Sequence, residues 1–459
     1  MQKVQVEEAI DKSRFNKFHL IVFIWCFFVI AFDGFDIALY GIGLPHMMED
    51  FGLTSAAGGA IGSYALAGMM LGTFVLGSFS DVIGRKRILI ICLVLISVFN
   101  ALAGLATSAT MFLVFRFIGS IGMGGLMPVV ISFMTEYSPK KNRAMTVAAM
   151  YCGYSIGAIV ASITAMYFIE SLGWRFMYFL SALPLLGLPF IIKQFPESIS
   201  YYLPRGHKKK VAEILNRANP EGNYNETDDF LYTTAQKGSK GLPVGKLFSD
   251  NRSITTIAFW VMVFSCLMMI YGLNTWLPTM MQESGFNVAS SMSFIMILAV
   301  GQIIGSLTGG YMVDRIGHKN VLLTMYLMGA ICFVALSVTQ QPALIYVLIA
   351  IGGACTGGTQ NLVNPYISAF YPSDIRGTGL SMAVGIGRLG SITAPILIGL
   401  VLMRTSNRRQ RSWRLPYRVC SAVLHCCSSV KETGKQCSQA HLLQMKRKIK
   451  TGQSDKISD

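Results

Sequence analysis

Residues 77–87 read GSFSDVIGRKR, and residues 310–320 read GYMVDRIGHKN. The two stretches share their glycine spacing, a central aspartate and a polar, basic end, and Asp81 and Asp314 lie 233 positions apart. The same offset aligns further residues with strong backbone preferences: Pro45 with Pro278, Gly68 with Gly301, Gly72 with Gly305, Gly124 with Gly357 and Pro139 with Pro372. Agreement at so many glycines and prolines in one register indicates two copies of one structural unit. We therefore predict an internal duplication.

The composition places both copies in a membrane. Hydrophobic residues make up 53% of the 459-residue chain and charged residues 14%, whereas soluble domains carry about 25% charged residues. A helix needs about 20 apolar residues to cross a bilayer. Eleven such runs follow one another: residues 18–45, 57–79, 88–107, 111–134, 144–169, 174–193, 254–278, 291–312, 321–339, 343–369 and 377–402. The first run is long and is followed by others, so a cleaved signal peptide is not expected.

Basic residues in the short loops predict the orientation of the chain. Lys12 and Arg14 precede the first run, the basic stretch at residues 85–87 follows the second, and Lys140 and Lys141 follow the fourth. These loops lie on one side of the membrane if every run crosses it. The amino terminus is therefore predicted to be cytoplasmic.

The apolar runs and the polar intervals divide the chain into four segments. Residues 1–193 are predicted to form a six-helix bundle, residues 194–253 a cytoplasmic linker, residues 254–402 a second bundle with five recognisable spans, and residues 403–459 a basic tail. Within the linker, the stretch from Lys208 to Ala218 suits a short surface helix. We expect this charged stretch mainly to solvate the join between the bundles.

The tail departs from the repeat. The offset of 233 places a twelfth span at residues 407–426, but that stretch holds five arginines, which are costly inside a bilayer. Residues 403–459 hold 13 Lys and Arg against 3 Asp and Glu, out of a net charge of +16 for the whole chain. We interpret the change at Met403 as a reading-frame shift or a disordered tail, so the twelfth span is missing or replaced. Its cysteines lack the paired spacing of a metal site.

Two six-span units that each carry the loop G-x-x-x-D-x-x-G-[RH]-[KR] resemble the major facilitator superfamily, and the resemblance covers residues 15–402. It implies an all-α membrane fold of two six-helix bundles related by a pseudo-two-fold axis. It also implies that the repeated loop latches a gate. The gating residues implied are Gly77, Asp81, Gly84, Arg85, Lys86, Asp314 and Gly317. On physical grounds, the basic residues of the loop also suit plain topology anchors, and that alternative stays open.

Charged residues inside the spans are candidates for function, because an ionisable group at membrane depth costs about 2.5 kcal/mol or more. Asp33 and Asp36 lie three residues apart in the first run and share one helical face. Two carboxylates on one face favour a wet cavity and the binding of a proton. The alternative is a helix-packing role in which a carboxylate pairs with a neighbouring cation.

Two arginines supply the opposite charge. Arg388 lies near the middle of the eleventh run between small neighbours, and a guanidinium suits a planar carboxylate bidentately. We predict that it binds substrate, with a salt bridge to Asp33 or Asp36 as the alternative. Arg116 in the fourth run is a weaker substrate-binding candidate, and a structural ion pair or a snorkelling position is equally consistent with it.

Neutral polar residues inside the spans are softer candidates for the wall of a binding site. A tyrosine stacks on an aryl ring and also donates a hydrogen bond, although most polar residues in such bundles only join helices. The substrate-wall candidates are Tyr64, Tyr154, Asn274, Gln360 and Asn361.

A narrower resemblance follows from the charged positions. Asp33-Gly34-Phe35-Asp36 resembles the D-G-[FY]-D signature of the aromatic acid:proton symporter family, and the segments 116–136, 274–278 and 385–388 are similar to that family as well. Members of the family import benzoate-like, hydroxybenzoate-like or phenylpropionate-like anions with protons. The resemblance implies roles in this chain for Asp33, Asp36, Asp81, Arg116, Glu136, His318, Arg376 and Arg388, of which Glu136, His318 and Arg376 are assigned to gating.

These features predict a secondary active transporter, not an enzyme, that imports an aromatic or related organic acid anion with protons by alternating access. We expect a monomer in the bacterial cytoplasmic membrane, driven by the proton gradient, with no cofactor, metal or nucleic acid. Two alternatives stay open: a major facilitator carrier of a sugar acid, another carboxylate or a drug, and a non-transporting or inactive truncated product. The chain holds no nucleophile–base constellation or phosphate-cradling loop that would argue for an enzyme or an ATP-driven pump.

Overall fold

The computed structural model describes residues 3–231, 244–249, 252–339, 341–371 and 376–406. Contacts divide the chain into two units. The first unit comprises Met1–Lys237, Asn274–Val300 and Pro395–Met403, and the second comprises Gly238–Leu273, Gly301–Ala394 and Arg404–Asp459. Three long helices of the carboxy-terminal half therefore contribute a part to each unit.

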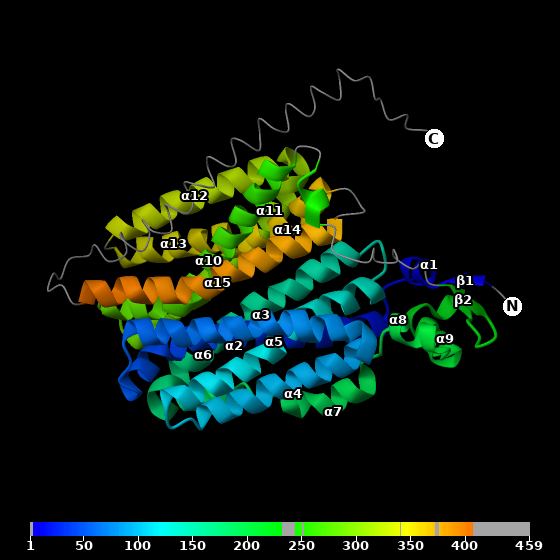
Figure 1. The fold of residues 1–459 in the computed structure, drawn as a ribbon, viewed down its shortest axis with the longest axis horizontal. Coiled ribbons are helices and arrows are strands. Elements are labelled where there is room, and N and C mark those ends of the chain that lie inside the picture. Colours follow the sequence, from blue (N-terminus) through cyan, green and yellow to red (C-terminus); the bar gives the residue numbers. More distant parts are fainter. Residues whose placement is uncertain (1–2, 232–243, 250–251, 340, 372–375, 407–459) are drawn as a thin grey trace, which may run out of the picture. The chain divides into compact units, whose positions relative to one another are not determined.

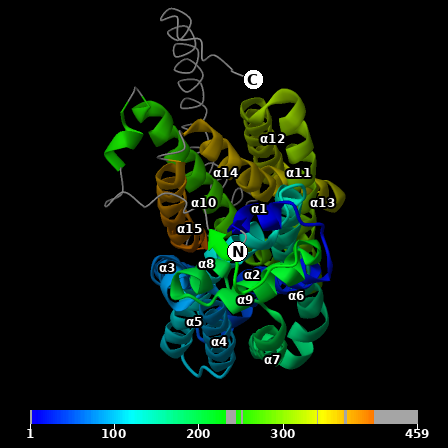
Figure 2. The same ribbon diagram turned by 90° about the vertical axis from the view of Figure 1, so that its right-hand side faces the viewer.

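The amino-terminal half of the chain folds into long apolar helices that lie side by side in both views (Figures 1 and 2). They are α2 (Lys17–Asp50), α3 (Ser55–Ile83), α4 (Arg85–Gly104), α5 (Ala109–Tyr137), α6 (Arg143–Leu180) and α7 (Pro184–Gln194). Polar caps set where three of them begin. The side chains of Asn16, Thr54 and Ser108 accept hydrogen bonds from the first free backbone N–H groups of α2, α3 and α5.

Helix α6 breaks at Gly173, where φ is +77°, a value that glycine adopts at little cost. Before the break, the helix begins at Arg143, whose side chain pairs with Asp11 close to the start of α2. After it, Trp174 donates to Asp50 at the far end of α2 over 2.8 Å. The chain then returns, because Gln194 at the end of α7 accepts a hydrogen bond from Trp25 near the start of α2. The segment from Arg143 to Gln194 therefore runs along the length of α2 twice, once in each direction.

The carboxy-terminal half repeats the helix boundaries of the first half. Its helices are α10 (Ser253–Glu283), α11 (Val288–Ile316), α12 (His318–Val338), α13 (Pro342–Gly353), the π-helical turn η4 (Ala354–Gly358), α14 (Thr359–Phe370) and α15 (Arg376–Ser406). Four of them begin 233 residues after their counterparts, since 288 − 55, 318 − 85, 342 − 109 and 376 − 143 all equal 233. The predicted duplication is confirmed.

The repeated glycines make the same contacts in both halves. A Cβ atom at Gly68 or Gly72 of α3 would meet the backbone oxygen of Phe117 or Ile121 in α5. The equivalent glycines of α11, Gly301 and Gly305, lie against the backbone of Ala350 and Ala354, which are again 233 residues further along. Small residues at these positions let the helix backbones approach closely. Close packing is therefore the role of these glycines.

Ten described helices or helix pairs are long and apolar enough to cross a membrane. Each of the eleven expected runs falls on one of them, since the candidate Met145–Gln194 contains the two runs on either side of Gly173. The predicted multi-pass helical membrane protein is thus confirmed. The expected twelfth span and the basic tail lie beyond Ser406, outside the described residues.

The described part of the linker folds together with the amino terminus. Strand β1 (Lys3–Gln5) pairs in parallel with β2 (Asp229–Leu231). These strands and α1 (Val6–Asp11), α8 (Ile199–Tyr202) and α9 (Lys208–Ala218) gather beyond one end of α2 to α7 (Figure 1). Short 3₁₀ turns complete the segment at Leu203–Arg205, Pro220–Gly222 and Val244–Leu247.

The expectation that the stretch from Lys208 to Ala218 mainly solvates the join is wrong. Val211 and Leu215 of α9 are fully buried in one apolar cluster with Val6 and Ile10 of α1 and Phe230 of β2. The charged residues of α9 had suggested a solvated helix, but its apolar residues form a single stripe that the amino-terminal segment covers. The small sheet is also the one departure of the described residues from an all-helical fold.

This packing predicts the effect of a charge at Val6, whose side chain is 0% exposed. Val6→Asp is expected to lower stability by about 2–4 kcal/mol, because it removes apolar burial and places an unpaired carboxylate in the cluster. Thermal melting and limited proteolysis of the purified protein would show a lower melting temperature and faster cleavage near residue 12. Lys3→Asp, at an exposed side chain of β1, is the control, and equal behaviour of the two variants would contradict the prediction.

Candidate functional site

A buried ion pair lies in the middle of the first unit. Nη1 of Arg116 in α5 donates to both carboxylate oxygens of Asp36 in α2, at 2.7 and 2.8 Å. The same nitrogen lies 2.8 Å from Oδ1 of Asn100 in α4. Nδ2 of Asn100 donates to Asp36 over 2.5 Å, which closes a triangle of hydrogen bonds. Arg116 is 4% exposed and its two partners are each 1% exposed.

Aromatic rings and one unused donor complete the surroundings of this arginine. The guanidinium carbon of Arg116 lies 5.9 Å from the ring centre of Tyr40 and 5.5 Å from that of Tyr178, so cation–π attraction adds to the ion pair. Nε of Arg116 is buried and has no hydrogen-bond partner among the described residues. Asp36 thus occupies one corner of the guanidinium, at Nη1, and leaves Nε unused.

Asp33 is also buried, at the point where α2 crosses α6. The backbone of Gly34 lies against the backbone of Tyr154 in α6, so close that no side chain fits between them. One turn further along α6, Gly157 lies against the backbone of Ala31 and Phe35, on either side of Gly34 in α2. The two predicted proton-coupling aspartates therefore differ in setting: Asp36 faces the arginine of α5, and Asp33 lies beside the closest approach of α2 and α6.

Arg388 lies in the second unit, where its Nη1 donates to the hydroxyl of Tyr271 in α10 over 3.0 Å. Its glycine neighbours allow this contact, because Gly387 and Gly390 let α15 approach α10 at Val263 and Phe264. Tyr271 was not among the predicted wall residues. It lies within a long apolar run and has no charge, so the sequence alone gave little signal for it.

The predicted wall residues lie in varied surroundings. Asn274 is buried and Tyr154 is half-buried, both in the first unit, whereas the Tyr64 side chain is 54% exposed. In the second unit, Gln360 is half-buried and Asn361 is exposed and donates to Oγ of Ser306 over 2.8 Å. The structure therefore groups Asp33, Asp36 and Arg116 with Tyr154, and it places Arg388, Gln360 and Asn361 in the other unit.

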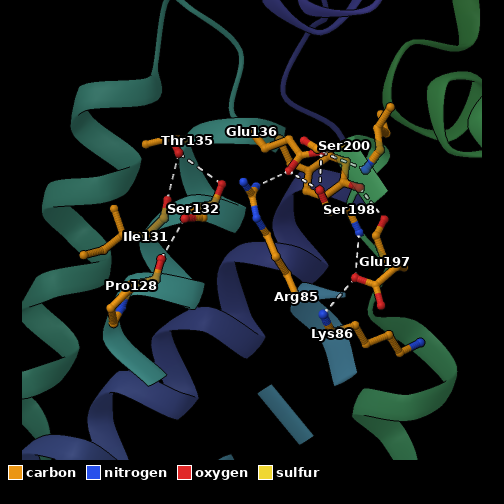
Figure 3. Close-up of polar contacts among 12 residues, drawn as sticks. Arg85, Lys86, Pro128, Ile131, Ser132, Thr135, Glu136, Glu197, Ser198 and Ser200 are labelled. Carbon is orange, nitrogen blue, oxygen red and sulfur yellow. Dashed lines mark hydrogen bonds and ion pairs between the residues drawn. The ribbon is translucent and has the colours of Figure 1, made fainter. Parts of the chain in front are cut away.

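The predicted gating residues Arg85 and Glu136 meet at the end of the bundle near the linker. Their side chains are 2.5 Å apart, and Glu136 also accepts hydrogen bonds from Oγ of Ser198, at 2.7 and 2.9 Å, and from the backbone N–H of Ile199, at 2.7 Å (Figure 3). The carboxylate thus caps the start of α8 while it holds the first residue of α4. An anion at a helix amino terminus is favourable.

A second carboxylate, Glu197, completes this cluster (Figure 3). It accepts from the backbone N–H of Lys86 at 2.9 Å and from that of Ser198 at 3.0 Å. Its backbone oxygen accepts from the buried hydroxyl of Tyr137 at 2.6 Å. Glu197 was not among the predicted site residues, because it falls in the predicted linker. Its position directly after Phe195-Pro196, at the end of a predicted span, is the sequence feature that could have marked it as a site residue.

A cavity of about 350 Å³ lies between this cluster and the amino-terminal helix α1. Its charged lining comes from Arg85, Glu136 and Arg143 on the bundle and from Glu7 and Asp11 on α1. Asp11 pairs with Arg143, so two ion pairs connect the ends of α1, α4, α5 and α6. The predicted gating loop is therefore part of a larger polar network.

The remaining gating candidates lie at the two repeated loops. Gly84 and Gly317 have φ values of +110° and +81°, so both copies of the loop turn through a conformation that favours glycine. Gly77 lies inside α3, and the His318 ring stacks on Tyr366 with 5.7 Å between ring centres. The side chains of Asp81, Asp314 and Arg376 lie outside the described residues.

The opposite end of the first unit is closed by backbone contacts between helices of the two repeats. A Cβ atom at Gly41 of α2 would meet the backbone oxygen of Asn274 in α10, and one at Gly59 of α3 would meet that of Pro395 in α15. Between them, Nε1 of the fully buried Trp276 donates to the backbone oxygen of Pro395 over 3.0 Å. No side chain larger than hydrogen fits at either glycine contact.

The described residues include no group of three or more His, Cys, Asp or Glu side chains placed to hold a metal ion. The two buried clusters around Arg116 and Arg388 are built from arginine, aspartate, asparagine and tyrosine side chains. These groups suit the binding of an organic anion and the transfer of a proton.

Comparison with known proteins supports this description. The family model described as Major Facilitator Superfamily matches residues 26–301 and 259–428. The match confirms the prediction of a membrane transporter rather than an enzyme.

Three relatives align with most of the chain. The benzoate transport protein of Acinetobacter baylyi is 35% identical over 406 residues, which is 87% of each chain. The 4-hydroxybenzoate transporter PcaK of the same organism is 29% identical, over 87% of this chain and 88% of its own length. The gallate transporter of Pseudomonas putida is 28% identical, over 87% of this chain and 89% of its own length.

Solved structures share the fold. The xylose transporter XylE from E. coli, in a partially occluded inward-open conformation, superposes with a TM-score of 0.70 at 15% identity, covering 91% of this chain and 98% of its own. The nucleoside transporter NupG superposes with a TM-score of 0.66 at 14% identity, covering 91% of this chain and 100% of its own. At such identities the likeness extends to the fold alone.

Proposed function

The chain belongs to the major facilitator superfamily, and from this premise we propose that it imports a benzoate-like aromatic carboxylate in symport with protons across a bacterial cytoplasmic membrane. The observation that carries the proposal is the buried Asp36–Asn100–Arg116 cluster, an intramembrane set of charges that a carrier of neutral solutes does not require. The names of the relatives, which transport benzoate, 4-hydroxybenzoate and gallate, support the same class of substrate.

The contacts support a division of roles between the charged residues. Arg388 has small neighbours and donates to a tyrosine hydroxyl, a set of groups that suits a carboxylate attached to an aromatic ring. Asp36 is committed to Arg116 and Asn100, so we assign proton uptake to Asp33. The network of Arg85, Glu136 and Glu197 then acts as the cytoplasmic latch, and the amino terminus lies in the cytoplasm.

We propose that these parts operate by alternating access. With the site open to the outside, Asp33 binds a proton and the anion pairs with Arg388. The two repeats then rock around the bound substrate, the glycine contacts at Gly41 and Gly59 close the outer end, and the latch at the inner end opens. Release of the proton to the cytoplasm frees the anion.

Uptake of radiolabelled benzoate into proteoliposomes under an imposed pH gradient tests this proposal. Asp33→Asn is expected to abolish uphill accumulation while benzoate exchange continues, and Arg388→Ala is expected to abolish both. Glu49→Gln, an exposed change on the same helix as Asp33, is the control. Unchanged, pH-driven uptake by both variants at equal expression would refute the assignment.

A panel of competing carboxylates separates the substrate classes. Benzoate, 4-hydroxybenzoate and gallate should compete with the labelled substrate more strongly than cis,cis-muconate or a sugar acid, because only the first three offer an aromatic ring to the tyrosines. A relative that transports cis,cis-muconate is 28% identical to the chain, so the open-chain dicarboxylate is the informative competitor. Stronger competition by muconate would favour a carrier of another carboxylate.

A further inference from the structure

Asn100 is a polar residue at an unusual place. It lies in the apolar helix α4, is 1% exposed, and is surrounded along its own helix by buried residues such as Ile96 and Ala103. A buried amide inside a membrane helix is costly unless its donors and acceptors are satisfied. The amide nitrogen of Asn100 donates to Asp36 and its amide oxygen accepts from Arg116. Both hydrogen bonds go to the same ion pair, which points to a role in that pair.

The geometry shows what the amide adds. An arginine and a carboxylate often pair through two nitrogens and two oxygens. Here a single nitrogen, Nη1 of Arg116, serves both oxygens of Asp36. The second donor to Oδ1 of Asp36 is Nδ2 of Asn100, and Oδ1 of Asn100 accepts from the same Nη1. The amide therefore turns the carboxylate onto one corner of the guanidinium.

This arrangement has a consequence for the rest of the arginine. Nε of Arg116 is buried without a hydrogen-bond partner among the described residues, and the rings of Tyr40 and Tyr178 lie within 6 Å of the guanidinium carbon. A bidentate pair with Asp36 would use two of the guanidinium nitrogens. The pairing seen here leaves the buried Nε unpaired, with a hydrogen to donate to a second planar carboxylate.

We propose that Asn100 is a positioning residue, which holds the Asp36 carboxylate on Nη1 of Arg116 and so keeps the Nε edge of that arginine open for the carboxylate of the substrate. It acts through Arg116 and does not itself touch the substrate. The proposal rests on the transport function proposed above and deepens it, because it adds a second anion-binding group on the side of Asp36.

Four elements face this cluster and define its charge. Asp36 and Tyr40 come from α2, Asn100 from α4, Arg116 from α5 and Tyr178 from α6, and Asp33 lies one turn before Asp36 on the same helix. One cation thus balances one carboxylate, with a neutral amide between them. A second carboxylate in place of the amide would give the cluster a surplus negative charge.

Kinetics of benzoate uptake test the positioning role through Asn100→Leu and Asn100→Asp. Asn100→Leu keeps the branched shape of the side chain and removes both hydrogen bonds, so Asp36 is free to pair bidentately, and the KM for benzoate is expected to rise about tenfold with a smaller change in kcat. Asn100→Asp is expected to move the pH optimum of uptake down by about one unit, because the added carboxylate must bind a proton before the cluster regains its charge balance. A merely structural amide would not raise the KM for benzoate, and the pH shift adds that the cluster's charge balance controls uptake.

Ser97→Ala is the matched control. Ser97 lies one turn earlier on α4, is also buried, and its hydroxyl has no hydrogen-bond partner among the described residues. Its replacement should leave both the KM and the pH profile unchanged. An unchanged KM in Asn100→Leu together with an unchanged pH profile in Asn100→Asp would overturn the proposal.

A double-mutant cycle on thermal stability tests, without any substrate, whether Asn100 holds the Asp36 carboxylate by hydrogen bonding. Asn100→Leu is expected to lower the melting temperature, and at least half of that loss should vanish in an Asp36→Asn background, because the partner charge is then gone. Additive losses would show that Asn100 does not act on Asp36. If the unmodified protein transports no carboxylate, the proposed function fails, while a non-additive cycle would still support the hold of Asn100 on Asp36.

Discussion

Gly41→Ala is expected to reduce uptake at least about tenfold, although it adds only one methyl group. The new Cβ would meet the backbone oxygen of Asn274, which cannot move aside as a flexible side chain would. Overpacking of this kind costs about 1–3 kcal/mol, and the cost falls on the state in which this end is closed. The protein should therefore accumulate in a state that is open there.

Cysteine labelling measures that shift directly. Thr275 is buried beside the contact, so Thr275→Cys should be protected from a membrane-impermeant maleimide in the otherwise unmodified chain and labelled when Gly41→Ala is also present. Gly43→Ala is the control on the same helix, because a Cβ there meets only side-chain atoms at 3.5 and 3.8 Å. Equal uptake and equal labelling for the two alanine variants would rule out a gate at Gly41.

The sequence predicted the fold well because the duplication carries strong constraints. Helix starts at residues 55 and 85 recur at 288 and 318, and the second of each pair follows Gly84 or Gly317, which the 233-residue offset already aligned. The family resemblance is confirmed by the matching model and by a relative at 35% identity. What the offset did not predict is the linker, since β2 depends on pairing with a strand at the amino terminus, Lys3 opposite Asp229.

The candidate sites were predicted as residues but not as clusters. Asp36 and Arg116 were predicted as separate site residues. Their contact depends on how α2 packs against α5, and local sequence patterns do not predict helix packing. Asn100 was missed because a single amide in an apolar run also fits a helix-packing role. Arg85 and Glu136 were likewise assigned to gating without any indication that they form a direct pair.

Arg116→Leu is expected to lower stability by about 3–5 kcal/mol, because it leaves the Asp36 carboxylate buried without its cation. The purified protein should melt several degrees lower, and uptake should fall below detection. The loss should be far larger than for Arg175→Leu, which breaks a pair with Asp50 whose side chains are 41% and 42% exposed. Exposed pairs of that kind contribute only about 0–1 kcal/mol.

The double variant Asp36→Asn/Arg116→Gln separates stability from transport. It removes both charges but keeps polar groups that hydrogen-bond with Asn100, so most of the melting temperature lost in Arg116→Leu should return. Uptake should stay absent, because a neutral amide cannot replace the guanidinium as a partner for the substrate carboxylate. Recovery of uptake together with stability would mean that the ion pair only joins α2 to α5. Stable folding without uptake would place Arg116 among the groups that bind the transported anion.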